Sequence, residues 1–181
     1  MREIIMAINW QDQIRSGRVE DLDTLAELEI DASEALIEVG ALPGVSPSAT
    51  PRHLMLQALS EGLVFVVADK DDYPLGFLAG LERDGGLYIG EIDVWRCWQR
   101  KGIGRALILH ALNEARRRNL WGGMLTTDRL APFNMRFYGL LGFVEVGLDQ
   151  APPSLAQVIR DEIESGHDPG RRVAMLSRAL R

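Results

Sequence analysis

The chain has 181 residues, of which 46% are hydrophobic and 25% are charged, a composition typical of a folded globular protein. This length can bury one substantial core, and no Pro-, Gly- or Ser-rich stretch is long enough to separate two domains. No apolar run reaches the ~20 residues that cross a bilayer, and residues 1–10 lack the pattern of a secretory signal. The single cysteine, Cys97, excludes an internal disulfide and a cysteine-based zinc cluster, and the three histidines show no paired ligand spacing. We therefore expect one cytoplasmic domain without a metal site.

Charge is distributed unevenly along the chain. Between Glu20 and Glu38 there are eight carboxylates and no Lys or Arg, whereas between Arg96 and Arg118 seven basic residues accompany one glutamate. The net charge of -6 argues against sequence-independent nucleic-acid binding, which depends on neutralising phosphates. Each run, taken singly, is compatible with a solvated helix face.

The N-terminal part of the chain predicts two helices. Apolar residues and Glu29 recur at helical spacing over residues 22–32, with carboxylates at 20 and 21 in the first turn. Gly40 is expected to break this helix into two pieces. Thr50 is expected to cap a short further helix that has Pro51 at its first position.

The remainder predicts a meander of strands followed by alternating helices and strands. Strands are expected over residues 63–68, 75–81 and 87–94, because β-branched and aromatic residues lie there between short turns. The expected elements after them are a helix over 103–118, a strand over 124–127, a helix over 132–141, a strand over 143–146, a helix capped by Ser154 and a strand over 173–180. This order predicts an α+β fold with a mixed, mostly antiparallel central sheet of about six or seven strands flanked by helices.

The turn between strand 87–94 and the helix that begins at residue 103 contains Gly102 and Gly104 among basic residues. Glycine lets backbone N–H groups approach an anion, and a helix N-terminus supplies about half a positive charge. A phosphate is therefore the expected ligand, although an ordinary strand-to-helix turn can contain the same glycines. The loop is not a Walker loop, and it lacks the third glycine of a dinucleotide-binding fold.

Two motifs resemble the GNAT superfamily of N-acetyltransferases. Gln99-x-x-Gly102-x-Gly104, which follows the strand Glu91-Ile92-Asp93-Val94 and precedes a helix, is similar to the acetyl-CoA signature of that family. Pro132-Phe133-Asn134-x-x-Phe137-Tyr138-x-x-x-Gly142-Phe143 is similar to the family's second cofactor-side motif. The resemblance covers roughly residues 14–143. It implies a single GNAT-type domain over residues 1–181, with residues 1–12 as an N-terminal extension.

The resemblance also implies the reaction and the cofactor site. GNAT enzymes transfer an acetyl group directly from acetyl-CoA, a co-substrate, to a primary amine, and they splay the signature strand from the next strand. The N–H of Val94 or its neighbour would polarise the thioester carbonyl. The residues expected to contact the cofactor are Ile92, Asp93, Val94, Gln99, Arg100, Lys101, Gly102, Ile103, Gly104, Arg105 and Asn134. The sequence departs from the family at Gln99, where arginine is commoner, and at Ala131, where many members have the asparagine that Asn134 would replace.

Tyr138 and Glu91 are the candidate catalytic residues. Tyr138 matches the family tyrosine that hydrogen-bonds the CoA sulfur and is the candidate general acid; the alternative is a core tyrosine packed beside Phe137. Glu91, followed by Asp93, is the candidate general base. Strand alternation puts both carboxylates on one face, which either lines the acceptor cleft or packs away from it.

The sequence does not specify the acceptor. In the family, the two helices after the first strand form a wall of the acceptor cleft, and here they carry the acidic run, which implies a cationic amine. If Glu34, Glu38 and their neighbours face solvent instead, they only raise solubility. A non-catalytic acyl-CoA-binding or sensing domain of the same fold is the rival interpretation. Neither a nucleic acid nor a membrane is expected as a partner, and a homodimer is left open.

Overall fold

The computed structural model describes residues 9–38, 47–131 and 133–178. Its elements in chain order are the 3-10 helix η1 (Trp10–Gln13), β1 (Ile14–Ser16), η2 (Val19–Asp21), α1 (Leu22–Glu38), α2 (Arg52–Ser60), β2 (Val64–Ala68), β3 (Pro74–Arg83), β4 (Gly86–Val94), η3 (Arg96–Trp98), α3 (Ile103–Arg117), β5 (Gly122–Asp128), α4 (Asn134–Leu140), β6 (Val144–Val146), α5 (Pro153–Glu164) and β7 (Arg172–Arg178). The strands form one seven-stranded sheet in the order β1-β2-β3-β4-β5-β7-β6. The β4–β5 pair is parallel and the other pairs are antiparallel, which confirms the predicted mixed α+β fold.

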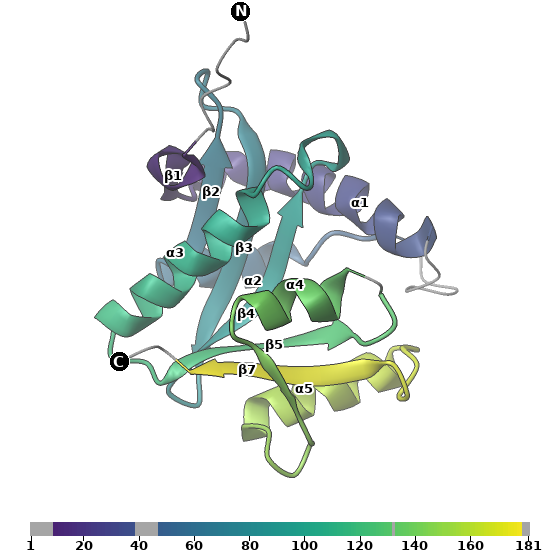
Figure 1. The fold of residues 1–181 in the computed structure, drawn as a ribbon. Helices are drawn as coiled ribbons and strands as arrows, with labels where there is room; N and C mark the ends of the chain where they lie inside the picture. Colours follow the sequence, from purple (N-terminus) through teal and green to yellow (C-terminus); the bar gives the residue numbers. More distant parts are fainter. Residues whose placement is uncertain (1–8, 39–46, 132, 179–181) are drawn as a thin grey trace, which may run out of the picture.

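Helices cover both faces of the sheet (Figure 1). Helices α3 and α4 lie on one face, where the largest core cluster joins them to the central strands. On the other face, α1 and α2 pack on β2 and β3, and α5 packs on β5 and β7. Strand β2 is buried along its whole length because it contributes side chains to both layers. No helix in the described ranges is long and apolar enough to cross a membrane.

A bulge in β4 decides where its two carboxylates point. Between the pairs Ala79–Glu91 and Gly80–Ile89, β4 contains one extra residue, Gly90. Residues 87 and 89 before the bulge and residues 92 and 94 after it all face the α3 layer. Without the extra residue, Glu91 and Asp93 would follow residues 87 and 89 into that layer. The bulge therefore directs both carboxylates toward α1 and α2.

Strands β4 and β5 separate soon after they meet. They pair at Leu87–Gly123 and Tyr88–Met124, although β4 continues to Val94 and β5 to Asp128. The divergence leaves main-chain groups of both strands without a strand partner at the carboxyl ends of the pair. This is the splay that the family resemblance implied, and it opens a gap through the sheet between its two helix layers.

Two predicted helix caps are wrong. Pro51 is the residue at the N-cap of α2, and Thr50 makes no capping bond because its hydroxyl is used elsewhere. Helix α5 begins at Pro153, and the backbone N of Ser154 donates to a carboxylate oxygen of Asp84 at 2.9 Å. A carboxylate from the β3–β4 turn thus stabilises the α5 N-terminus in place of the expected serine.

The N-terminal part differs from expectation at two further points. Strand β1 was not predicted, and the carboxylates at 20 and 21 belong to η2, which precedes α1. The helix break predicted at Gly40 lies outside the described residues.

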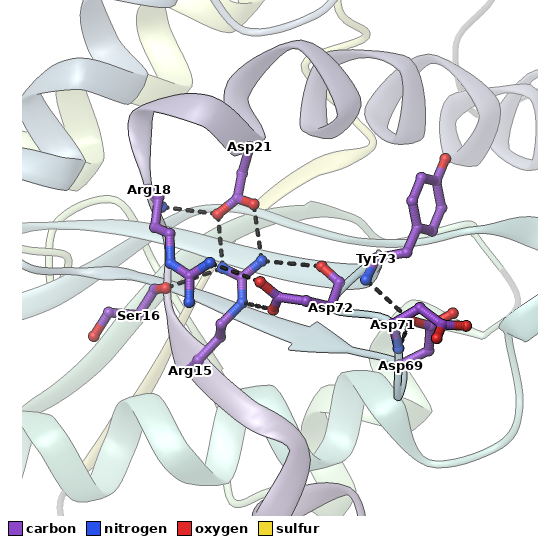
Figure 2. A network of polar contacts seen from close by, with 8 residues as sticks. All are labelled: Arg15, Ser16, Arg18, Asp21, Asp69, Asp71, Asp72 and Tyr73. Carbon is purple, nitrogen blue, oxygen red and sulfur yellow. Dashed lines mark hydrogen bonds and ion pairs between the residues drawn. The ribbon is translucent and has the colours of Figure 1, made fainter.

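An ion-pair network fastens the β1 edge of the sheet (Figure 2). Arg15 donates to both carboxylate oxygens of Asp21, at 2.7 and 2.8 Å, and also pairs with Asp72 in the β2–β3 turn. Arg18 bonds Asp72 at 2.7 Å. Burial acts to raise the pKa of Asp21, but the hydrogen bonds from Arg15 and Arg18 outweigh it and the pKa is lowered. The network lies at the opposite edge from β6 and serves to hold β1 and η2 in place.

Candidate active site

The loop between β4 and α3 presents a row of free N–H groups. Gly102, at the N-cap of α3, has a φ of 92°, and Arg100 has a φ of 59°, so two residues of this loop adopt left-handed backbone. In the described part of the chain, no acceptor bonds the backbone N–H groups of residues 100–105. These groups, together with the α3 N-terminus, form a concave set of donors suited to an anion.

Side chains behind the loop hold it in this conformation. Trp10 donates from Nε1 to the carbonyl of Lys101 at 2.7 Å, and Gln11 donates to the carbonyl of Ala106 at 2.9 Å. Gln99 donates from Nε2 to the carbonyl of Val94 at 3.2 Å. Side chains thus bond carbonyls within and on both flanks of the loop, while its N–H groups stay open. Trp98 packs edge-on against Trp10.

The basic run is divided among three locations. Arg96 bonds Glu34 and Glu38 of α1 at 2.7 and 2.5 Å, and Arg117 and Arg118 pair with Glu114 at the far end of α3. The cations left exposed beside the free N–H groups are Arg100, Lys101 and Arg105.

The acidic run is divided in the same way. Glu34 and Glu38 are paired with Arg96, and Asp31 accepts the backbone N–H of Arg96 at 2.8 Å. These residues therefore anchor α1 to the end of β4. Within α1, Glu29 is the carboxylate that bonds toward the β4 carboxylates, by way of Thr50.

Three half-buried carboxyl groups gather on the α1–α2 side of the β4–β5 gap. Glu29 accepts from both the backbone N and the hydroxyl of Thr50, each at 2.8 Å. The same Thr50 hydroxyl lies 3.0 Å from Oε1 of Glu91. Asp93, two residues along β4, lies on the same face as Glu91. Glu91 and Asp93 therefore face the interior, as the base assignment requires, and Glu29 joins them.

These carboxyl groups titrate at unusually high pH. Burial is the main cause for Glu91, and the charges of Asp93 and Glu29 add to it, so its pKa lies well above the usual range. Burial and the charge of Glu29 raise the pKa of Asp93 to about 8. Burial also raises the pKa of Glu29. The cluster therefore retains protons near neutral pH, where a group of matched pKa can both accept and release one.

Tyr138 reaches the gap from the opposite helix layer. Its ring is buried and contacts Phe137 and Phe143, with ring centroids 5.2 and 5.9 Å apart. Burial, followed by the charges of Asp93 and Glu91, raises its pKa above the ordinary value of 10.0. Tyr138 is thus packed in the core as the alternative interpretation expected, and it is also within electrostatic reach of the β4 carboxylates. It remains a proton donor at neutral pH.

Asn134 and Asp128 fix α4 against the end of β5. Asn134 donates from Nδ2 to the hydroxyl of Thr127 at 3.0 Å, and Asp128 accepts the backbone N–H groups of Leu130 and Ala131 at 2.7 and 3.0 Å. These bonds set the position of α4 and hence of Tyr138. A direct contact of Asn134 with the cofactor stays a prediction.

Two pockets meet at Thr50. The β4 pocket, of about 110 Å³, is lined by Thr50, Leu54, Met55, Ala58, Ala79, Gly80, Leu81, Tyr88, Gly90 and Glu91. The α1–α2 pocket, of about 240 Å³, is lined by Leu22, Asp23, Leu25, Ala26, Glu29, Thr50, Arg52 and Met55. Thr50 and Met55 line both pockets, whereas Glu91 lines only the β4 pocket and Glu29 only the α1–α2 pocket.

Sequence reasoning missed Thr50 and Glu29 as members of the site. Thr50 before Pro51 has the pattern of a helix cap, which concealed its other use. The sequence does contain an indication of the role of Glu29, because this residue occupies the apolar face of α1, four residues after the buried Leu25. A carboxylate at such a position needs a polar partner.

Comparisons with known proteins agree with this geometry. The sequence model of the acetyltransferase (GNAT) family matches residues 28–143. N-acetylglutamate synthase from Neisseria gonorrhoeae, solved with coenzyme A and N-acetyl-glutamate, is 19% identical with a TM-score of 0.70, over 93% of this chain and 35% of that one. This chain thus spans about a third of that synthase.

Two further solved structures have the same fold over nearly their whole length. The ribosomal-protein-S18-alanine N-acetyltransferase from Escherichia coli is 18% identical with a TM-score of 0.65, over 93% of this chain and 94% of that one. The PaiA N-acetyltransferase from Thermoplasma acidophilum, in complex with coenzyme A, is 15% identical with a TM-score of 0.67, over 91% and 97%. The family match covers more than half of the chain, from α1 through α4, and includes both motifs and the loop described above. The chain belongs to the acetyltransferase (GNAT) family.

Proposed function

We propose that the chain transfers an acetyl group from acetyl-CoA to a primary amine by direct transfer, and that the preferred amine is cationic. The observation that carries the proposal is the meeting of three features at the β4–β5 gap. These are the free N–H groups of residues 100–105, the buried phenol of Tyr138 and the carboxyl group of Glu91.

The loop fits the phosphate groups of the co-substrate. The N–H groups of residues 100–105 match a diphosphate, and the exposed Arg100, Lys101 and Arg105 suit a further phosphate. Ile92, Asp93 and Val94 lie at the end of β4, beside the gap that would take the pantetheine arm, and the Gln99 side chain bonds the carbonyl of Val94. Bound acetyl-CoA supplies an activated acetyl thioester.

Two side chains move protons in this proposal. Glu91 takes a proton from the ammonium group of the acceptor, which leaves the amine with a free electron pair. Tyr138 donates its phenolic proton to the departing thiolate sulfur, and it is reprotonated by the second proton that the attacking nitrogen loses as the amide forms. The two groups approach the gap from opposite helix layers, so one side of the reacting centre accepts a proton while the other supplies one.

A glycine substitution in the loop tests the cofactor assignment. Gly102→Ala is expected to remove most of the rise in melting temperature that acetyl-CoA causes, because a side chain at a φ of 92° costs roughly 1–2 kcal/mol and distorts the donor row. Gly139→Ala is the matched control, since a Cβ there meets nothing within 4 Å. Equal acetyl-CoA-induced shifts in both variants would refute the loop as the cofactor site.

The acceptor preference follows from the carboxyl cluster. Glu29, Glu91 and Asp93 lie on the side of the gap away from the loop, so a cationic amine is attracted there and an anionic one is repelled. We expect 1,3-diaminopropane to have a higher kcat/KM than β-alanine, an amine of similar size with a carboxylate at its far end. The kcat/KM for the diamine should fall as ionic strength rises. A preference for β-alanine would contradict the cationic assignment.

Free thiol released from acetyl-CoA over a panel of amines tests the activity itself. Thiol release that depends on an amine supports transfer, whereas cofactor binding without such release supports the non-catalytic alternative. A cytoplasmic location, a single domain over residues 1–181 and the oligomeric state stay predictions from the sequence.

A further inference from the structure

The contacts among Glu29, Thr50 and Glu91 require one more proton than two ionised carboxylates and one hydroxyl group contain. The Thr50 hydroxyl has a single proton, yet its oxygen lies 2.8 Å from Oε1 of Glu29 and 3.0 Å from Oε1 of Glu91. A hydroxyl can donate to one carboxylate only, so the second carboxyl must itself be protonated and donate to the hydroxyl oxygen. Both short contacts are satisfied when the pair holds one proton.

This proton has two alternative positions. Either Glu29 is protonated and donates to Thr50, which donates to Glu91, or Glu91 is protonated and the two hydrogen bonds run the other way. Passing from one arrangement to the other moves two protons along short hydrogen bonds and needs no movement of the heavy atoms. The backbone N–H of Thr50, at 2.8 Å from Glu29, keeps that carboxyl group in place throughout.

Glu91 and Glu29 line different pockets, so moving the proton between them carries it from one pocket to the other. Glu91 lines the β4 pocket, whereas Glu29 lines the α1–α2 pocket, whose wall includes the exposed Asp23 and Arg52. The Thr50 side chain borders both pockets. A proton that passes from Glu91 to Glu29 therefore leaves one pocket and reaches the other.

We propose that Thr50 relays protons from Glu91 to Glu29, so that the proton removed from the acceptor amine leaves through the α1–α2 pocket. The proposal rests on the acetyltransferase function proposed above. The cycle begins with Glu91 ionised and Glu29 protonated. Glu91 takes a proton from the ammonium group, Glu29 releases its own to water, and Glu91 then passes one proton to Thr50 while Thr50 passes one to Glu29. Each proton is accounted for, and Glu91 is again a carboxylate.

Other ionisable groups face this pair and set the conditions of the test. Asp93 on β4 raises the pKa of Glu91, and Glu162 on α5 has a weaker effect in the same direction. Glu162 is itself paired with Arg172 at 2.5 Å. None of these groups is altered in the variants below, so their influence stays constant. Thr50 and Glu29 act through Glu91 and are positioning residues.

Thr50→Val removes the hydroxyl but keeps the side-chain shape and the backbone N–H bond to Glu29. We expect kcat to fall ~10-fold, and the acidic limb of its pH profile to move to higher pH, because the Thr50 hydrogen bond lowers the pKa of Glu91. Thr50→Ser keeps a hydroxyl and should restore both values to within about twofold of the native protein. Failure of Thr50→Ser to restore both values would overturn the relay, because a hydroxyl group at this position would then not be sufficient.

Glu29→Gln gives a second signature. In the relay Glu29 holds the shared proton while Glu91 is ionised, so a neutral glutamine there should move the acidic limb little, while the plateau value of kcat falls because the proton has no carboxylate to reach. If Glu29 instead acted only through a negative charge, its removal would lower the pKa of Glu91 and move the limb to lower pH with an undiminished plateau, and that result would overturn the proposal.

Carbon-13 NMR of the labelled glutamate carboxyl groups tests the shared proton without any turnover. One protonated carboxyl group, lost in both Glu29→Gln and Glu91→Gln spectra, is expected near neutral pH in the native protein and in Thr50→Ser. Two ionised carboxylates at this pH would overturn the relay even if the protein is an active acetyltransferase. If the shared proton is present but no amine is acetylated, the proposed function fails and the relay, as a step of that reaction, fails with it.

Discussion

Replacing Glu91 by glutamine is expected to lower kcat by roughly 10²- to 10⁴-fold, the usual contribution of a positioned acid or base. Glutamine has nearly the same shape and can still hydrogen-bond Thr50, so the bulge at Gly90 and the fold should be retained. Because Glu91 has a raised pKa, native activity should fall as the pH decreases, when the carboxyl group becomes protonated and can no longer accept the ammonium proton. The pH dependence of kcat checks this sign.

Asp93→Asn separates the two β4 carboxylates. The pKa of Asp93 is about 8, and its charge raises the pKa of Glu91. If Glu91 is the base, Asp93→Asn should retain most of the activity and move the acidic limb to lower pH. A loss of activity in Asp93→Asn comparable to that expected of Glu91→Gln, with Glu91→Gln itself active, would transfer the base role to Asp93.

Tyr138→Phe is expected to lower kcat ~10²-fold or more and to change the affinity for acetyl-CoA little. The ring packs between Phe137 and Phe143, and phenylalanine preserves both ring contacts, so the variant removes the proton donor without disturbing α4. Thermal shifts with acetyl-CoA measure the affinity, and thiol release measures kcat. Tyr73→Phe, at an exposed tyrosine in the β2–β3 turn, is the matched control. Unchanged turnover in Tyr138→Phe would leave this tyrosine with a packing role.

The acidic run over residues 20–38 shows that ion pairing can withdraw charged residues from a binding site. From the sequence alone, charge reversal of Glu34 and Glu38 is the natural test of a preference for cationic acceptors. In the structure, however, each of these carboxylates is paired with Arg96 just after β4. Reversal would also free Arg96 and detach α1 from the strand that carries Glu91, so the experiment would not isolate the acceptor. Glu29 is the residue of this run that contacts the site.

Local patterns in the sequence were sufficient to predict the architecture and the loop and motif that are proposed to hold the cofactor. Runs of β-branched and aromatic residues between short turns predicted the central strands, and apolar residues at every third or fourth position predicted helix α3. The glycine loop and the motif containing Tyr138 are contiguous, so their spacing could be read without knowing what packs against them. The same reading failed at Thr50 and Ser154, where residues with good capping propensity lie next to helices that are stabilised in other ways.

Only the tertiary structure decided which residues meet at the proposed acceptor side. The direction of Glu91 depends on one extra residue, Gly90, whose presence as a bulge is defined by pairing with β3 and not by the sequence of β4. The partnership of Glu29, Thr50 and Glu91 joins α1, the segment before α2 and β4, which lie 21 and 41 residues apart along the chain. Such contacts, and the pKa values that follow from shared burial, exist only once the layers have packed, because desolvation and charge coupling depend on distance in space.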